Sequence, residues 1–134
     1  MINSTENHCG AGRRGEALAL LHLQKMGYTL VRQNYRNGRG EIDLVMDDPN
    51  GVLVFVEVKT NRSSQSGYPL ERIDGRKIRQ VQRMAQRYCW EFSQENRDIR
   101  FDVIGVQLKQ DGSEEIEHIP SAFLPDMAGY YLGR

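Results

Sequence analysis

The sequence predicts an α/β domain with a central mixed β-sheet flanked by helices, in the order α-β-β-β-α-β. Two observations lead to this prediction. Residues 41–46 and 52–59 are rich in β-branched and apolar side chains, and the Asp-Asp-Pro-Asn-Gly segment between them is typical of a hairpin turn. Residues 76–92 instead repeat apolar side chains at spacings of three and four, which is typical of an amphipathic helix.

The first third of the chain adds a helix and a strand. Residues 1–12 are polar and are predicted to form a flexible tail, with a helix over residues 13–26. Gly27 should end this helix in the left-handed conformation. A strand is expected over residues 28–35, and the glycine-rich basic turn that follows leads into the hairpin.

The hairpin places charged side chains close together. Successive side chains of a strand point to opposite faces, so Glu57 and Lys59 continue the face that bears Leu53 and Phe55. In the first strand the same alternation predicts Ile42, Leu44 and Met46 on one face and Glu41, Asp43 and Val45 on the other. If the hairpin pairs Asp43 near Glu57, two carboxylates and one ammonium group converge.

The second half of the chain completes the domain. Residues 60–75 lack periodicity, and we weigh two interpretations for them, a substrate flap and a plain surface loop. Residues 101–106 should form a strand and residues 115–119 an edge strand. We therefore predict one domain over residues 13–119. The tail over residues 120–134, which carries Phe123, Tyr130 and Tyr131, is expected to pack on the domain or on a partner subunit.

Composition limits the function classes. The 18 basic residues balance 18 acidic ones, which argues against a generic nucleic-acid binder. The basic residues cluster, however, because residues 76–88 hold five of them and no acid, so one basic face is expected. The two cysteines have no ligand spacing, which favours a reducing, cytoplasmic setting. No run predicts a signal peptide or a membrane span.

A glycine pattern near the start of the chain is misleading. Residues 10–15 spell Gly-x-Gly-x-x-Gly, but the dinucleotide fingerprint requires a preceding strand, and only a polar tail precedes this one. We therefore expect no nucleotide cofactor.

The predicted charge cluster fits metal-dependent phosphodiester hydrolysis. Mg²⁺ prefers oxygen ligands, so Asp43, Glu57 and the main-chain carbonyl of Val58 would suffice to hold it. Lys59 would orient and help deprotonate the attacking water. Glu16 lies on the apolar side of the first helix. Its carboxylate is either a favourable negative charge in the first turn, where the helix dipole is positive, or it reaches the cluster.

These residues also carry a family resemblance. Glu16, Gly40-Glu41-Ile42-Asp43, Val56-Glu57-Val58-Lys59 and the basic helix that begins at Arg76-Lys77 resemble the YraN family of small bacterial proteins. That family is similar to the PD-(D/E)xK nuclease superfamily, especially the archaeal Holliday junction resolvases, and the likeness covers residues 11–106. It implies a restriction-endonuclease-like fold in which Asp43, Glu57 and Lys59 take the three catalytic positions. Glu16 would match the acid supplied by the first helix, and Ile42 replaces the superfamily's proline.

We therefore expect a Mg²⁺-dependent DNA endonuclease, with Mn²⁺ as a substitute, that acts on structured or branched DNA. Seven basic residues would contact the DNA backbone: Arg13, Arg39, Arg62, Arg76, Lys77, Arg79 and Arg83. A junction resolvase would act as a homodimer. Two alternatives stay open: a non-catalytic nucleic-acid-binding or scaffold protein that retains the fold, and an interaction module whose arginine helix meets an acidic protein.

Overall fold

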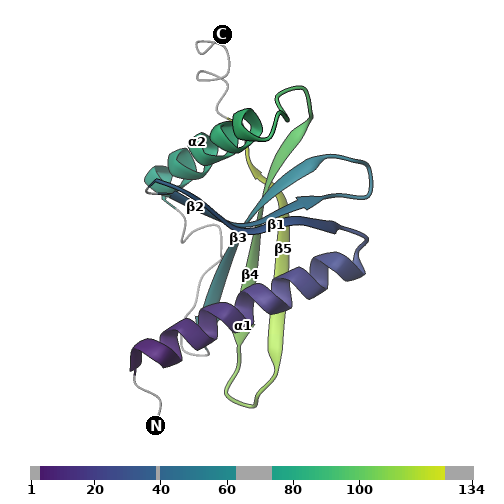
Figure 1. Cartoon of the computed structure of the whole chain (residues 1–134). Helices are drawn as coiled ribbons and strands as arrows, with labels where there is room; N and C mark the ends of the chain where they lie inside the picture. Colours follow the sequence, from purple (N-terminus) through teal and green to yellow (C-terminus); the bar gives the residue numbers. More distant parts are fainter. Residues whose placement is uncertain (1–3, 39, 63–73, 126–134) are drawn as a thin grey trace.

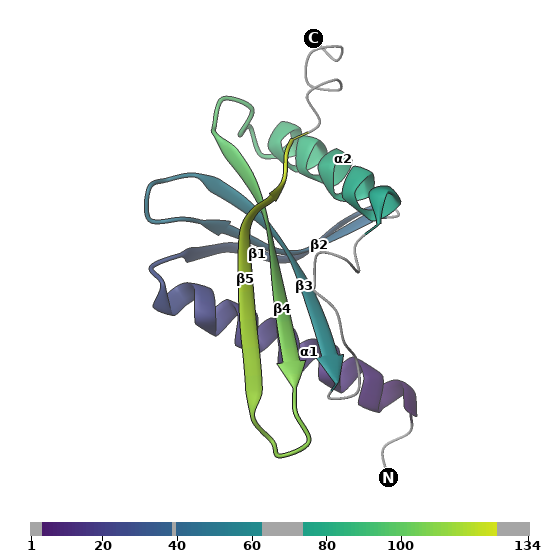
Figure 2. The ribbon, with the colours of Figure 1, turned by 180° about the vertical axis from the view of Figure 1, so that it is seen from behind.

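A five-stranded mixed sheet separates two helices in the computed structural model, which describes residues 4–38, 40–62 and 74–125 (Figure 1 and Figure 2). The elements are α1 (Ser4–Lys25), β1 (Thr29–Asn37), β2 (Gly40–Asp47), β3 (Leu53–Arg62), α2 (Gly75–Glu91), β4 (Ile99–Leu108) and β5 (Glu114–Phe123). This order and the mixed sheet confirm the predicted α/β class, which is consistent with a restriction-endonuclease-like fold. In the described part of the chain, neither helix is long and apolar enough to cross a membrane.

The strands lie in the sheet in the order of the sequence, β1-β2-β3-β4-β5. Neighbouring strands are antiparallel except β3 and β4, which are parallel. A parallel pair needs a crossover connection, and α2 lies within the connection here. The parallel pairing runs over the full length of β3, from Leu53 opposite Ile99 to Arg62 opposite Leu108.

Each face of the sheet carries its own apolar core. One core joins the sheet to α2 and includes Phe55, Val81, Ala85, Tyr88 and Phe101. The other joins the sheet to α1 and includes Ala19, Leu23, Val54, Val56 and Ile104. The predicted alternation in β3 is confirmed, because Leu53 and Phe55 belong to the α2 core whereas Val54 and Val56 belong to the α1 core.

The alternation predicted for β2 does not hold before Leu44. Leu44 and Met46 pack in the α1 core, but Ile42 lies with Val45 in the α2 core. The strand geometry is irregular at this point, because Asn34 of β1 has a φ of 53° and β2 pairs with β3 only as far as Leu44. A one-residue change in alternation moves a side chain to the opposite face.

The N-terminal helix is longer than predicted, because α1 begins at Ser4 rather than at residue 13. The sequence predicted a tail because residues 1–12 are polar, and Gly10 and Gly12 each disfavour a helix by about 1 kcal/mol relative to alanine. No proline interrupts the run. Packing of the following turns on the sheet stabilises a helix that propensity alone disfavours.

The other end of α1 is as predicted. Gly27 has a φ of 92°, in the left-handed region. The N–H groups of Gly27 and Tyr28 donate to the carbonyls of Gln24 and Leu23, each at 3.0 Å. These two hydrogen bonds form a Schellman motif, which directs the chain into β1.

The remaining boundaries differ modestly from prediction. Helix α2 agrees within one residue at each end, and the Asp74 carboxylate caps it by accepting a hydrogen bond from the Lys77 N–H at 2.9 Å. Strand β3 continues to Arg62, and most of the predicted flap lies outside the described residues. Strand β5 extends past the predicted boundary at residue 119, and Phe123 stacks on Phe101 with ring centroids 5.0 Å apart. Tyr130 and Tyr131 lie outside the described residues.

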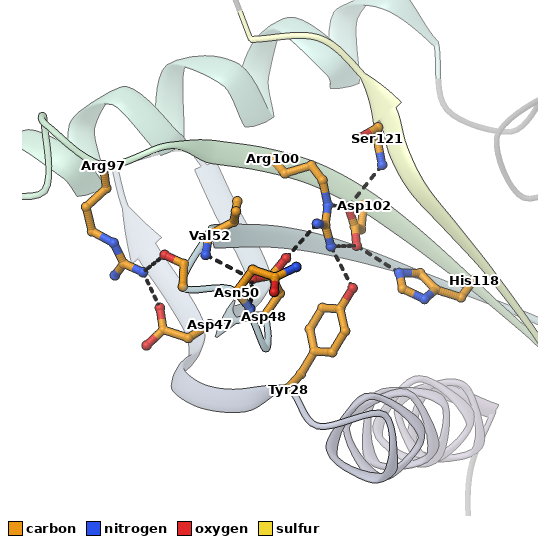
Figure 3. A network of polar contacts seen from close by, with 11 residues as sticks. Tyr28, Asp47, Asp48, Asn50, Val52, Arg97, Arg100, Asp102, His118 and Ser121 are labelled. Carbon is orange, nitrogen blue, oxygen red and sulfur yellow. Dashed lines mark hydrogen bonds and ion pairs between the residues drawn. The ribbon is translucent and has the colours of Figure 1, made fainter.

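A polar network joins the sheet to the end of α1 and to the turn between β2 and β3 (Figure 3). The Arg100 guanidinium donates to Asp102, to Asp48 and to the Tyr28 hydroxyl at 2.6–3.0 Å. Asp102, which is fully buried, also contacts His118 Nε2 at 2.8 Å. Asp48 further accepts hydrogen bonds from the N–H groups of its own turn, so this acidic segment is an ordinary hairpin turn.

Candidate active site

The candidate site lies where β2 and β3 separate. Backbone pairing between these strands runs from Asp47 opposite Leu53 to Leu44 opposite Val56. At the next position the Asp43 carboxylate takes the place of a strand neighbour, because its Oδ2 atom accepts a hydrogen bond from the Val58 N–H at 2.8 Å. The side chain of Asp43 is therefore fixed between the two strands.

The structure brings Asp43 close to Glu57, a convergence that the sequence left conditional on the register of the hairpin. Glu57 is 4% exposed. Burial raises its pKa to about 7, and the negative charge on Asp43 contributes to the rise. The pKa of Asp43 is also raised, chiefly by burial and then by Glu41, although the hydrogen bond from Val58 opposes the change. Two carboxylates in one partly buried place disfavour each other's ionisation.

Two lysines face this pair. Lys59 follows Glu57 on the same face of β3 and favours the ionised forms of both acids. Lys77 comes from α2, and its Nζ atom lies 3.6 Å from Glu57 Oε2. We predicted Lys77 only as a DNA contact, whereas the structure places its ammonium group beside a predicted catalytic acid.

A second group of acids adjoins Asp43. Glu16, Glu41 and Asp43 each offer a carboxylate oxygen, and these three atoms lie within 4.8 Å of one another. Burial, the charge on Asp43 and the charge on Glu41 together raise the pKa of Glu16 to about 7. Of the two interpretations of Glu16, the structure supports the one in which it reaches the cluster.

Two neighbours hold this second group in place. When the Asn34 amide is assigned with its nitrogen toward the acids, this nitrogen donates to Glu16 Oε1 at 2.9 Å and to Glu41 Oε1 at 3.1 Å. Arg36 Nε lies 3.6 Å from Glu41 Oε2. Asn34 adopts the left-handed conformation, which asparagine tolerates better than most residues, at the position in β1 from which its amide faces the acids.

Close packing of α1 on β3 places Glu16 at the site. A Cβ atom added to Gly15 would overlap the Thr60 hydroxyl and would lie 3.0 Å from the Thr60 Cβ. Only glycine allows this approach. Because Glu16 follows Gly15 directly, the position of its carboxylate depends on that contact.

The donor set suits a hard divalent cation. Carboxylates whose pKa values are raised by burial and by one another are stabilised when a cation joins them. The carboxylate oxygens of Glu16, Glu41 and Asp43 lie within 4.8 Å of one another, close enough for one Mg²⁺ to draw them together as ligands. Asp43 also adjoins Glu57, and its contact with Val58 is to the N–H group rather than to the carbonyl that the sequence predicted as a ligand.

Sequence reasoning missed Glu41 as a member of the site. A signal was available, since Glu41 precedes Asp43 by two residues, which strict alternation places on the same face. It also missed Asn34 and the position of Lys77. No local pattern identifies these two, because each reaches the acids from another element.

The predicted DNA contacts are dispersed. Arg76, Lys77 and Arg83 line an open groove of about 960 Å³ beside α2, which we call the α2 groove, together with Arg87, Trp90, Asn37 of β1 and Gly40 of β2. Arg79 is exposed on α2 but does not line the groove. Arg13 is exposed on α1, Arg62 is exposed at the end of β3, and Arg39 lies outside the described residues.

Comparisons with known proteins identify relatives across most of the chain. A model of the "Uncharacterised protein family UPF0102" matches residues 15–106, a range that holds all four predicted catalytic residues. The UPF0102 protein of Chlorobium chlorochromatii is 42% identical over 127 residues, covering 91% of this chain and 97% of that protein. The corresponding protein of Trichlorobacter lovleyi is 43% identical over 113 residues, covering 84% and 88%. That of Desulforamulus reducens is 38% identical, covering 83% and 93%.

Proposed function

This chain belongs to the UPF0102 family of uncharacterised proteins, and on that premise we propose that it is a Mg²⁺-dependent endonuclease that hydrolyses DNA phosphodiester bonds in structured or branched DNA. The family carries no established activity, so the proposal is argued from the site. The observation that carries it is the convergence of Asp43, Glu57 and two lysines at the point where β2 and β3 separate.

The electrostatics of the site support this proposal over a purely structural role. Glu16 and Glu57 both have pKa values raised to about 7, chiefly by burial. Each of these acids lies beside Asp43, and holding ionised carboxylates together opposes folding unless a cation binds them. Perturbed acids of this kind are typical of functional sites.

The residues fit the roles that phosphodiester hydrolysis requires. Asp43, Glu57 and the Val58 carbonyl would hold Mg²⁺, and Glu16 and Glu41 extend the donor set on the other side of Asp43. Mg²⁺ would supply positive charge against the phosphate. Lys59 would orient the attacking water and help to remove its proton.

Lys77 adds a second ammonium group to the site, besides that of Lys59. Its Nζ atom is 3.6 Å from Glu57 Oε2, and its side chain is 31% exposed, so the ammonium can also reach a bound phosphate. A positive charge aimed at the oxygens of the transferred group would stabilise the charge that develops there. DNA is the favoured substrate because the α2 groove, which Lys77 also lines, is rich in arginine.

The test is cleavage of labelled single-stranded, duplex, flap and four-way-junction DNA in Mg²⁺ or Mn²⁺. We expect the wild-type protein to cut at least one branched substrate. Asp43→Ala and Lys59→Ala should each reduce the rate by at least about 100-fold, since each removes a group that acts on the reacting phosphate or water.

Lys109→Ala provides the matched control, because Lys109 pairs with Glu115 on the surface and takes no part in the site. Equal cutting by wild type and Asp43→Ala would contradict the assignment. If wild type cuts no substrate but binds DNA in a salt-dependent way, the non-catalytic alternative is favoured.

A further inference from the structure

Trp90 is the chain's single tryptophan, and 76% of its surface is exposed. It lies near the end of α2, outside both apolar cores. A single exposed apolar residue is common in proteins and needs no explanation by itself. Trp90 is distinctive because of the surface that it adjoins.

Trp90 continues a row of basic residues along one side of α2. Arg76, Gln80, Arg83, Arg87 and Trp90 recur at alternating spacings of four and three, so they share one side of the helix. All five line the α2 groove. At 1.5 Å per residue, the row spans about 21 Å of helix.

The three arginines of this row are exposed. In the described part of the chain, no ion pair joins Arg76, Arg83 or Arg87 to an acid. Asp74 is the only acid among the described residues that line the groove, and its carboxylate caps α2. The groove is therefore suited to an anionic chain.

The α2 groove leads to the candidate active site. Lys77 lines the groove and also lies 3.6 Å from Glu57 through its Nζ atom. Asn37 at the end of β1 and Gly40 at the start of β2 form the opposite wall. A Cβ atom on Gly40 would overlap Met84 of α2, so the start of β2 approaches the helix closely. An anionic chain in the groove would pass beside the acids.

We infer that the α2 groove binds an unpaired DNA strand, with Trp90 stacking on one base while Arg76, Arg83 and Arg87 contact the phosphates. This inference rests on the proposed nuclease function and narrows its substrates to those that contain a single-stranded segment. The aromatic side chain favours single-stranded over double-stranded DNA, because a base exposes its π-face to a protein only when it is unstacked. A duplex would use the arginines but not Trp90.

Intrinsic fluorescence gives a direct test, since Trp90 is the only tryptophan. Oligo(dT) is titrated into the wild-type protein in EDTA, so that binding is measured without cleavage. We expect saturable quenching of Trp90 emission and an affinity that falls as salt rises. A fully paired duplex of equal length should quench much less. Absence of quenching at saturating oligo(dT) would overturn the inference.

Variants separate stacking from charge. Trp90→Ala should weaken binding of labelled oligo(dT) by about 5- to 100-fold, whereas Trp90→Phe should restore most of it because a ring remains. Arg83→Ala should weaken oligo(dT) and duplex alike and reduce the salt dependence. The matched controls are Leu21→Ala and Lys25→Ala, which change an exposed apolar residue and a basic residue on α1. Equal losses by Trp90→Ala on oligo(dT) and duplex would overturn the claim of strand preference.

The two proposals fail in different ways. Quenching and selective loss in Trp90→Ala, without cleavage of any DNA, would support the groove and contradict the nuclease. Cleavage that depends on Asp43, combined with unchanged oligo(dT) binding in Trp90→Ala, would support the nuclease and overturn the groove. Circular dichroism of each variant ensures that a change in binding is not a change in folding.

Discussion

At the scale of single residues, the negative charge of buried Glu57 opposes folding. Glu57 is almost fully buried beside Asp43, with a pKa raised to about 7, and its partner Lys77 remains partly exposed. A carboxyl whose folded pKa exceeds its unfolded value of about 4.5 binds more protons in the folded state between these pH values. Its contribution to stability is therefore present below about pH 4.5 and is lost as pH rises through about 7.

We predict that Glu57→Gln stabilises the metal-free protein at pH 8. The substitution keeps the size of the side chain and removes a buried charge, so the free energy of unfolding should rise by about 1–3 kcal/mol. Thermal melting in EDTA at pH 5 and pH 8 measures the effect, which should nearly vanish at pH 5.

The control for this prediction is Glu117→Gln, on the exposed strand β5, which should change little at either pH. A loss of stability in Glu57→Gln at pH 8 would mean that the Lys77–Glu57 pair stabilises the fold. The site would then be an ordinary ion pair.

At the scale of elements, the contact between α1 and β3 decides where Glu16 lies. Gly15 meets Thr60 with no room for a Cβ atom, whereas a Cβ atom at Gly10 or Gly12 meets nothing within 4 Å. Alanine favours a helix over glycine by about 1 kcal/mol when space allows. The three glycines of α1 therefore separate helix propensity from packing.

We predict opposite effects for alanine at these positions. Gly15→Ala should lower the free energy of unfolding by about 1–3 kcal/mol through overpacking, and should reduce cleavage because Glu16 moves away from Asp43. Gly12→Ala, the matched control, should raise stability by up to about 1 kcal/mol and leave cleavage unchanged. Urea denaturation of the wild type and the two variants measures their stability, and cleavage of the same labelled DNA measures their activity. Equal stability of Gly15→Ala and Gly12→Ala would refute the close approach.

At the scale of the whole molecule, the Arg100 network connects elements that are distant in sequence. Asp102 on β4 contacts His118 and the Ser121 N–H of β5, while Arg100 reaches Asp48 in the β2–β3 turn and Tyr28 after α1 (Figure 3). Burial alone would raise the pKa of Asp102, but the hydrogen bonds from His118, Arg100 and Ser121 hold it below its usual value of 3.8. Its stabilising contribution is present above pH 3.8 and is lost as pH falls through the lower folded pKa.

We predict that Asp102→Asn lowers the free energy of unfolding at pH 7 by about 2–4 kcal/mol, because Arg100 and His118 lose their shared buried anion. The loss falls short of that for a fully buried pair, since the Arg100 side chain is 22% exposed. Denaturant unfolding against pH should show the difference from wild type shrinking below about pH 4. Asp98→Asn, an exposed neighbour, should be nearly neutral. A pH-independent difference would mean that the charge of Asp102 is not what stabilises the network.

Much of the fold follows from patterns that lie within single elements. The alternation of β3 placed Glu57 and Lys59 on one face, and the three-and-four spacing of α2 identified its buried stripe of Val81, Ala85 and Tyr88. The glycine after α1 marked the end of that helix correctly. Such patterns are local, because strand pleat and helix pitch repeat over a few residues. The beginning of α1 at Ser4 escaped prediction because residues 1–12 are polar and carry no apolar repeat that would indicate a helix.

The site itself combines both kinds of information. By itself the sequence determined which chemical groups the hairpin carries, and it left the convergence of Asp43 with Glu57 conditional on the strand register. Only the tertiary structure decided that Asn34 contacts Glu16 and Glu41, that Lys77 contacts Glu57, that Glu41 completes a cluster with Glu16 and Asp43, and that Trp90 adjoins a basic groove. These contacts join separate elements. Their distances are set by how α1 and α2 bury their apolar faces against opposite sides of the sheet, which no short sequence pattern encodes.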